Sequence, residues 1–390
     1  MVFVVTGLFS ATFFTGTFEA CKDFVMGNSG MIYRVQKFQK RIEENSQTGL
    51  MYHDKMIDLN SLKDYLLGTK VIVKDDTTVA KTDSGSLIQA EPKIPVEDID
   101  STVSEIEKLK TVSENNGASF LYCVAPSKEL YQVAPPNVEN YEPENYGCFL
   151  RGLSDAGIPY IELGKALIEK GLDTSEMFYY TDHHWTARCG FTANKILCEE
   201  LGKRYGFEYT EQYTDIDNYN ITEYENWFLG SNGKKVGLYF SGKGADDFEL
   251  ITPKFKTDLI EQQPLKGQIR KGDFQNTVIF KKNLEKDFHK SNTYSTYSGG
   301  DFHLQIITNN FNPQGKKILI IRDSFASVVT PFLSLQTSEL HICDMRNFGG
   351  MVGEKINVEE YIKEINPDYV LVLFSGISSS DFEYDKFVFF

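Results

Sequence analysis

The chain has 390 residues, 41% of them hydrophobic, which is enough to bury the core of one large domain with an appendage. Its formal net charge is −15 and no long basic run is present, so we expect no nucleic-acid partner and no bulk electrostatic attraction to an anionic membrane. None of the six cysteines belongs to a Cys-x-x-Cys pair, so neither a zinc ribbon nor a thioredoxin-like motif is indicated.

Residues 1–27 form an apolar N-terminal segment in which no charge precedes Glu19. The segment is just long enough to resemble a signal anchor, but it lacks a basic region and contains two glycines before that glutamate. It is equally compatible with a genuine signal and with a truncated membrane segment.

Residues 28–97 are predicted to form a helical arm followed by a β-hairpin. Val35, Phe38 and Ile42 have helix-like spacing within the arm, which extends to about residue 66. The hairpin joins residues 71–79 to 84–88, with Asp75-Asp76 as a turn. Two prolines and three acidic residues make 90–98 a plausible linker.

Residues 98–390 alternate helical patterns with short apolar runs that are typical of buried parallel strands. The predicted strands are 120–125, a weaker one at 160–163, 318–321, 340–343 and 370–374; the predicted helices are 101–116, 185–204 and 358–365. This alternation predicts an α/β fold, a three-layer α/β/α domain with a mainly parallel sheet. Residues 207–312 have short alternating runs rich in Tyr, Thr, Gly and Asn, and are predicted to be a β-rich insertion at the rim of the site.

Ser324 comes shortly after the apolar run 317–321. A serine that opens a helix after a parallel strand lies at the carboxyl edge of the sheet, where the active sites of such folds are found. The helix N-terminus also offers free N–H groups to an oxyanion, so Ser324 is a candidate nucleophile. The alternative is a helix cap, because Asp323 and Ser324 are both favoured cap residues.

Asp182 precedes His184 by two residues and can orient its imidazole as a general base. Asp182 is also a possible helix cap, a role for which Thr181 or Thr186 would serve equally well. Adjacent histidines at a helix start point about 100° apart, so at most one is catalytic. The spacing favours His184, and we interpret His183 as structural.

A metal site is the competing interpretation of Asp182-His183-His184, because such triplets occur in manganese phosphoesterases. Those sites need further Asp-x-Asp and His ligands on other strands. Asp98-x-Asp100 is the sole upstream candidate and lies in the acidic linker-like stretch. We therefore predict no metal and no other cofactor.

The motif Tyr179–Thr186 resembles the signature of the DHHW proteins, relatives of the SGNH hydrolase-like O-acetyltransferases and esterases that act on bacterial exopolysaccharides such as alginate. Further similar segments are Ala125–Glu129, Gly230–Lys234, Arg322–Ala326 and Asp344–Arg346, so the resemblance extends over about residues 70 to 375. The order Asp-x-His before Ser is that of the alginate-type enzymes. Ordinary SGNH esterases begin with Gly-Asp-Ser, and here Arg322 takes the place of that glycine.

The resemblance implies an extracytoplasmic O-acetyltransferase that passes an acyl group from Ser324 to a polysaccharide, with the N-terminus as its candidate membrane anchor. It also implies a membrane-bound O-acyltransferase as the partner that delivers the acyl group, and it favours His184 as the base. Two alternatives stay open: a carbohydrate O-acetyl esterase, and a catalytically silent carbohydrate-binding or assembly component, which the change at Arg322 would permit.

Six further residues are candidate substrate or oxyanion contacts: Lys128, Trp185, Gly230, Ser231, Arg322 and Arg346. The Ser324 N–H is a natural oxyanion donor, and the Gly230-Ser231 loop offers a second because glycine permits close backbone approach. Lys128 and Arg346 follow strands that end at the same sheet edge as Ser324. Trp185 either packs the loop or offers a surface on which a sugar stacks.

Overall fold

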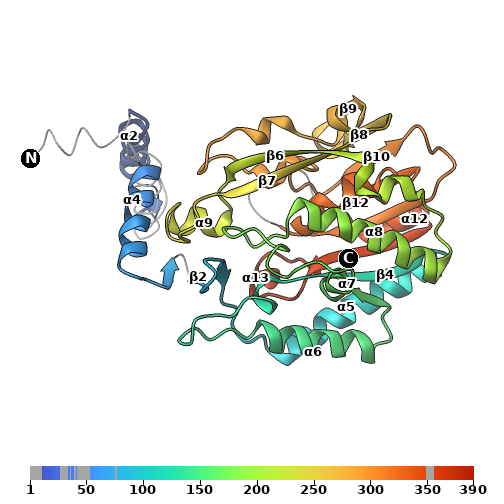
Figure 1. The fold of residues 1–390 in the computed structure, drawn as a ribbon, viewed down its shortest axis with the longest axis horizontal. Helices are drawn as coiled ribbons and strands as arrows, with labels where there is room; N and C mark the ends of the chain where they lie inside the picture. The colour runs from blue at the N-terminus through green and yellow to red at the C-terminus, as the bar shows by residue number, and fades with distance from the viewer. Residues whose placement is uncertain are drawn as a thin grey trace, which may run out of the picture. The chain divides into compact units, whose positions relative to one another are not determined.

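The computed structural model describes residues 11–26, 34–35, 37–38, 41, 53–74, 77–347 and 355–390. These residues belong to two compact units, one made of 1–69 with 236–240 and the other of 70–235 with 241–390 (Figure 1). The predicted turn at Asp75-Asp76 and the arm around Ile42 lie outside the described residues.

The first unit contains helices α2 (Ala11–Met26) and α4 (His53–Leu66). Residues 236–240 join it through hydrogen bonds to α4, in which the Leu238 N–H donates to Asp58 and the Tyr239 N–H donates to Ser61. No helix in the described residues has the length and apolar character needed to cross a membrane.

The second unit is built on a sheet of eight strands in the order β5-β4-β13-β11-β12-β10-β8-β9 (Figure 1). The first five strands in that order pair in parallel and the last three pair antiparallel, so the predicted mainly parallel α/β sheet is confirmed. The strands are β4 (Ser119–Ala125), β5 (Tyr160–Glu162), β8 (Leu259–Gln263), β9 (Gln268–Gly272), β10 (Gln305–Asn309), β11 (Lys317–Arg322), β12 (Glu339–Cys343) and β13 (Tyr369–Ser375).

Apolar side chains of the parallel strands point alternately into two cores, one on each face of the sheet. In β11, Ile318 and Ile320 join one core, and Leu319 and Ile321 join the other. The first core includes side chains of α7 (Leu163–Glu169), α8 (Ala187–Tyr205) and α11 (Thr330–Leu333); the second includes side chains of α5 (Val96–Asn115), α6 (Glu142–Asp155) and α12 (Val358–Ile365). Burial on both faces explains why these strands read as continuous apolar runs.

Two helix starts differ from the sequence expectation. α5 begins at Val96 rather than Ser101, with Pro95 before it and Glu97 and Asp98 in its first turn. Acidic side chains are favourable at the positive end of a helix, so part of the predicted linker is helical. α8 is capped by Thr186, whose side chain accepts from the Cys189 N–H, and this leaves the Asp182 carboxylate free for another role.

The predicted insertion at 207–312 contains strands, but three of them extend the central sheet instead of forming a separate layer. β8, β9 and β10 continue it antiparallel beyond β12. β6 (Tyr219–Phe228) and β7 (Asp246–Pro253) form their own antiparallel pair, followed along the chain by α10 (Phe274–Thr277).

The remaining elements lie outside the central sheet. β1 (Val71–Lys74), β2 (Thr77–Lys81) and β3 (Leu87–Gln89) form a small antiparallel sheet, with one strand more than the predicted hairpin. The short helices α9 (Ser231–Val236) and α13 (Ser379–Glu383) complete the fold.

Candidate active site

Ser324 opens a short 3₁₀ helix, Ser324–Val328, directly after β11 and Asp323. Asp323 fixes this turn from both sides: its carboxylate accepts from the Phe325 N–H at 3.0 Å and from the N–H and hydroxyl of Ser375 at 2.8 and 2.9 Å. Ser375 ends the neighbouring strand β13. Asp323 is therefore the cap, and the Ser324 hydroxyl stays available at the carboxyl edge of the sheet.

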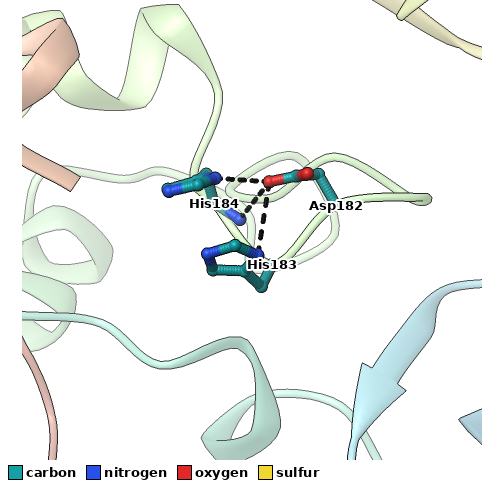
Figure 2. A group of neighbouring side chains, drawn as sticks. All are labelled: Asp182, His183 and His184. Atoms are coloured by element: carbon teal, nitrogen blue, oxygen red, sulfur yellow. Dashed lines mark hydrogen bonds and ion pairs between the residues drawn. The ribbon is translucent and has the colours of Figure 1, made fainter. Parts of the chain in front are cut away.

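Asp182, His184 and Ser324 form a continuous hydrogen-bonded array, although 140 residues separate the histidine from the serine. His184 Nε2 lies 2.7 Å from Ser324 Oγ, and His184 Nδ1 lies 2.5 Å from Asp182 Oδ1. The same carboxylate oxygen accepts the His184 backbone N–H at 2.9 Å (Figure 2). In the neutral tautomer that donates from Nδ1 to Asp182, Nε2 is free to accept the serine proton. The structure brings together the three residues that the sequence singled out.

The Asp182 carboxylate is buried and ionised. Burial raises its pKa, but the positive charge that His184 and His183 can carry, together with hydrogen bonds from His184 and the Ser231 N–H, outweighs this and holds the pKa well below its ordinary value. A charged aspartate fixes the ring orientation of His184 and stabilises the imidazolium that forms on proton transfer. The Tyr294 ring also stacks on His184, with ring centroids 4.1 Å apart.

The Gly230-Ser231 loop positions Asp182. The prediction that this loop supplies an oxyanion donor is wrong. The Ser231 N–H donates to Asp182 Oδ2 at 2.6 Å, and the Gly230 N–H donates to Thr181 Oγ1 at 2.8 Å. Both N–H groups are thus already used. The glycine is required for another reason, because a Cβ at position 230 would lie 2.2 Å from the Cβ of Asp182.

Lys128 is a fully buried support of the Asp182 loop, so its predicted contact with substrate is wrong. Its Nζ lies within hydrogen-bonding distance of four carbonyl oxygens, those of Leu87, Tyr179, Tyr180 and Asp182, at 2.7 to 3.0 Å. Burial lowers the pKa of Lys128 to about 8 against the opposing effect of nearby carboxylates, Asp246 first.

Asp246 holds the same loop from β7. It accepts the backbone N–H groups of Tyr180 and Thr181 and the Thr181 hydroxyl. Burial raises the pKa of Asp246 to about 6, against the effect of these hydrogen bonds. No local motif marks Asp246, so its role in holding this loop was not predicted from the sequence.

Arg322 is buried and is not the oxyanion or substrate contact that we predicted. Its guanidinium donates to the Gly300 carbonyl at 2.7 Å and pairs with Asp301. The arginine at this position is therefore accommodated by partners away from the Ser324 hydroxyl. Arg346 borders the pocket, but it donates to Asp344 at 2.6 and 3.0 Å and lies 3.2 Å from Asp301.

Trp185 packs the loop and offers no surface to a sugar. Its ring is fully buried, and its Nε1 donates to the Phe325 carbonyl at 2.9 Å. This bond ties the Asp182–His184 segment to the turn that carries Ser324. Of the two interpretations of Trp185, the structure favours packing.

His183 borders the pocket beside Ser324. Its Nδ1 lies 2.9 Å from Ser231 Oγ, and its ring is 3.8 Å from that of His184. Burial, together with repulsion from His184 when that ring is protonated, lowers the pKa of His183 to about 3, so the His183 ring is neutral at ordinary pH.

Asp182, His183 and His184 also form the one group in the described part of the chain whose ligand atoms are close enough to share a metal ion (Figure 2). Their ligand atoms are nevertheless engaged with one another. Asp182 Oδ1 binds His184, and Asp182 Oδ2 binds the Ser231 N–H, so neither carboxylate oxygen is without a hydrogen-bond partner.

A pocket of about 210 Å³ opens beside Ser324. Its lining includes His183, Phe325, Arg346, Ser375 and several acidic side chains that the sequence analysis missed, namely Glu91, Glu129, Glu142 and Asp381. These acidic residues come from separate segments that belong to no common motif, so no sequence signal groups them.

Residues 87–216 match the family model of the SGNH hydrolase-like domain of the acetyltransferase AlgX. Over these residues the chain is similar to SGNH hydrolase-like domains. PatB1 of Bacillus cereus, of which a structure with a sulfonyl adduct is also known, has the same fold: TM-score 0.65 and 20% identity over 80% of this chain and all of PatB1. A DHHW family protein from Eubacterium siraeum is similar as well, with TM-score 0.58 and 19% identity over 78% of this chain and 92% of that protein. No curated protein sequence matches the chain significantly.

Proposed function

We propose that the chain is a serine O-acyltransferase that acetylates hydroxyl groups of a cell-surface or secreted polysaccharide through an acyl-Ser324 intermediate. The observation that carries the proposal is the array from Asp182 through His184 to the Ser324 hydroxyl, which opens on a pocket. The match to an acetyltransferase family model supports transfer over hydrolysis.

In the first half of the reaction, Ser324 Oγ attacks the carbonyl carbon of the acyl donor while His184 Nε2 takes its proton. The tetrahedral oxyanion lies near the Ser324 N–H, which has no acceptor among the described residues and starts the 3₁₀ helix. Collapse of the intermediate releases the donor alcohol, which receives the proton from His184, and leaves acyl-Ser324.

In the second half, His184 removes a proton from an acceptor hydroxyl, whose oxygen attacks the acyl-serine carbonyl. Breaking the ester to Ser324 returns the proton to Oγ and yields the acylated acceptor. Asp182 stays ionised throughout and stabilises the imidazolium at each step. Water in place of the sugar hydroxyl would give the esterase outcome, the second candidate.

A membrane-bound O-acyltransferase as acyl donor and an extracytoplasmic location belong to the same proposal. The catalytically silent alternative depended on the arginine at position 322, and the contacts of that buried side chain with its own partners weigh against it.

Labelling with an arylsulfonyl fluoride tests the nucleophile, since a relative carries a sulfonyl adduct. Ser324 Oγ should form the bond to sulfur as fluoride leaves, which intact mass spectrometry detects. Ser324→Ala and His184→Ala should each abolish labelling and lower ester turnover by at least about 1,000-fold. Ser84→Ala, which changes an exposed serine, is the control and should leave both unchanged.

Transfer is separated from hydrolysis by mass spectrometry of an added oligosaccharide. Acetyl groups gained by the oligosaccharide support the transferase, whereas release of free acetate alone supports the esterase. A folded Ser324→Ala variant with full labelling and full turnover would refute the serine mechanism.

A further inference from the structure

One wall of the pocket beside Ser324 consists of three glutamates without a basic partner. Glu91 accepts from the N–H and hydroxyl of Ser379 at 3.2 and 3.1 Å. Glu129 accepts from the Gln89 N–H at 3.0 Å and from the Ser127 hydroxyl at 2.9 Å. Among the described residues, neither of them nor Glu142 forms an ion pair with Lys, Arg or His.

The other carboxylates of this pocket each have a cation beside them. Asp323 and Asp381 share Lys386, whose Nζ lies 3.1 and 3.0 Å from their carboxylates. Arg346 is held between Asp344 and Asp301. The three glutamates are therefore carboxyl groups of the pocket that no cation accompanies within the described residues.

Glu142 supplies an independent sign of a missing ligand. Only 2% of the residue is exposed, it borders the pocket, and its Oε2 has no hydrogen-bond partner within the described structure. Burial and the neighbouring Glu129 and Glu91 raise the pKa of Glu142 well above its ordinary value. A buried carboxyl oxygen without a donor is costly, and a bound group that brings a donor removes that cost.

We propose that Glu91, Glu129 and Glu142 form a subsite for the protonated amine of an amino-sugar unit in the acceptor, and that this subsite disfavours uronate polymers. The inference rests on the proposed acyl-transfer function and assigns its substrate class. An ammonium group offers three donors to surrounding carboxylates, whereas a sugar carboxylate would meet like charges at short range.

A sugar ammonium needs only one or two of these carboxylates as direct acceptors, whereas a metal ion needs several ligand atoms close together. The carboxylates come from three different segments, and within the described residues their oxygens are not close enough together to count as an ion-binding group. A hexosamine unit is large enough to reach several of them while presenting a neighbouring hydroxyl to Ser324.

Calorimetric binding to the Ser324→Ala variant tests the subsite without requiring turnover. The probes are tetrasaccharides of glucosamine, N-acetylglucosamine and galacturonic acid, at a pH where the glucosamine amine is protonated. Glucosamine tetramer should bind at least about tenfold more tightly than the acetylated tetramer, since one charge-assisted hydrogen bond is worth about that factor. The galacturonate tetramer should bind most weakly.

Glu91→Gln and Glu129→Gln, each added to Ser324→Ala, should weaken glucosamine binding by about tenfold. Both substitutions conserve shape, and thermal unfolding checks that each variant is folded. Glu139→Gln, which changes an exposed glutamate between β4 and α6, is the matched control and should leave the affinity unchanged.

Equal affinity for the amine and its acetylated form, no binding of either, or unaffected glutamine variants would each overturn the subsite. These outcomes do not depend on the proposed function, because the Ser324→Ala protein performs no acyl transfer. Conversely, an unlabelled and inactive parent enzyme that still prefers the glucosamine tetramer would refute the acyltransferase and leave the amine subsite standing.

Discussion

Asp182 is held at every hydrogen-bonding position that matters for orienting His184. One carboxylate oxygen binds the backbone and side chain of His184, and the other binds the Ser231 N–H. The Lys128 ammonium group forms hydrogen bonds with backbone carbonyl groups of the same loop. In the proposed mechanism, a His184 base oriented so rigidly is preorganised for proton transfer, so small displacements of this loop should lower the rate.

The close approach of Gly230 to Asp182 gives a direct test. Gly230→Ala places a Cβ 2.2 Å from the Asp182 Cβ, so the carboxylate must move. We expect kcat for a small acetyl ester to fall on the order of 100-fold while the fold survives, as for other small displacements of catalytic groups. Gly147→Ala in α6, where the nearest atom would be 3.7 Å away, should leave kcat unchanged. An unchanged kcat in Gly230→Ala would contradict the positioning role.

The low pKa of His183 predicts how stability depends on pH. In the folded protein this pKa is about 3, below the ordinary value of 6.5. The unfolded chain therefore binds a proton between those values that the folded chain rejects, and stability falls as pH falls through this window. His183→Gln should lose less thermal stability than the parent between pH 7.5 and pH 5. An equal loss in both proteins, measured by calorimetry, would contradict the low pKa.

At this scale the sequence predicted the three hydrogen-bonded residues, but not the groups that hold them in place. The grouping of Asp182, His184 and Ser324 could be predicted because their residue types and spacing are those of a known mechanism. The roles of Gly230 and Ser231 were wrong, since the direction of a backbone N–H depends on loop packing. Lys128 and Arg322 lie at the carboxyl edge of the sheet, as predicted. Their side chains nevertheless point into the protein, Lys128 toward carbonyl groups and Arg322 toward the Gly300 carbonyl and Asp301.

At the scale of elements, the turn that carries Ser324 is fixed between two neighbouring strands. Asp323 follows β11 and binds Ser375 at the end of β13, while the buried Lys386 forms an ion pair with both Asp323 and Asp381. Lys386 keeps the pKa of Asp323 low despite burial, so the carboxylate stays an acceptor. The position of Ser324 thus depends on a cation from a segment far along the chain.

Replacing Lys386 tests that dependence. Lys386→Met leaves two buried carboxylates without their cation and should lower the unfolding free energy by about 3 to 5 kcal/mol. Lys363→Met removes an exposed helical pair with Glu359 and should cost less than about 1 kcal/mol. Denaturant unfolding of both variants measures the difference, and similar losses would mean that the buried cluster is not stabilising.

Elements with strong local patterns were predicted well. The runs that became β4, β11, β12 and β13 are apolar throughout because both faces of the sheet are buried, and α12 was bounded correctly by Asn366-Pro367. The antiparallel extension by β8, β9 and β10 was not foreseen. Their alternating pattern identifies them as strands. The pairing of β10 with β12 joins segments that are distant in sequence, so the local pattern does not predict it.

At the scale of the whole molecule, the net charge of −15 should govern how charged substrates approach. Raising the salt concentration shortens the Debye length from about 30 Å at 0.01 M to about 8 Å at 0.15 M. We expect kcat/KM for a cationic oligosaccharide acceptor to fall across this range and that for an anionic one to rise. Hydrolysis of a neutral acetyl ester is the control, and equal salt effects on all three would exclude electrostatic steering.

The separation of 140 residues between His184 and Ser324 has a kinetic consequence for folding. Their alignment requires β4, β13, β11 and the 179–182 loop together, so it depends on contacts with long sequence separation, which form slowly. Helices such as α5 and α8 can form early from local contacts without bringing the two residues together. During refolding, helical circular dichroism should recover first, and ester turnover should return only with the slowest phase.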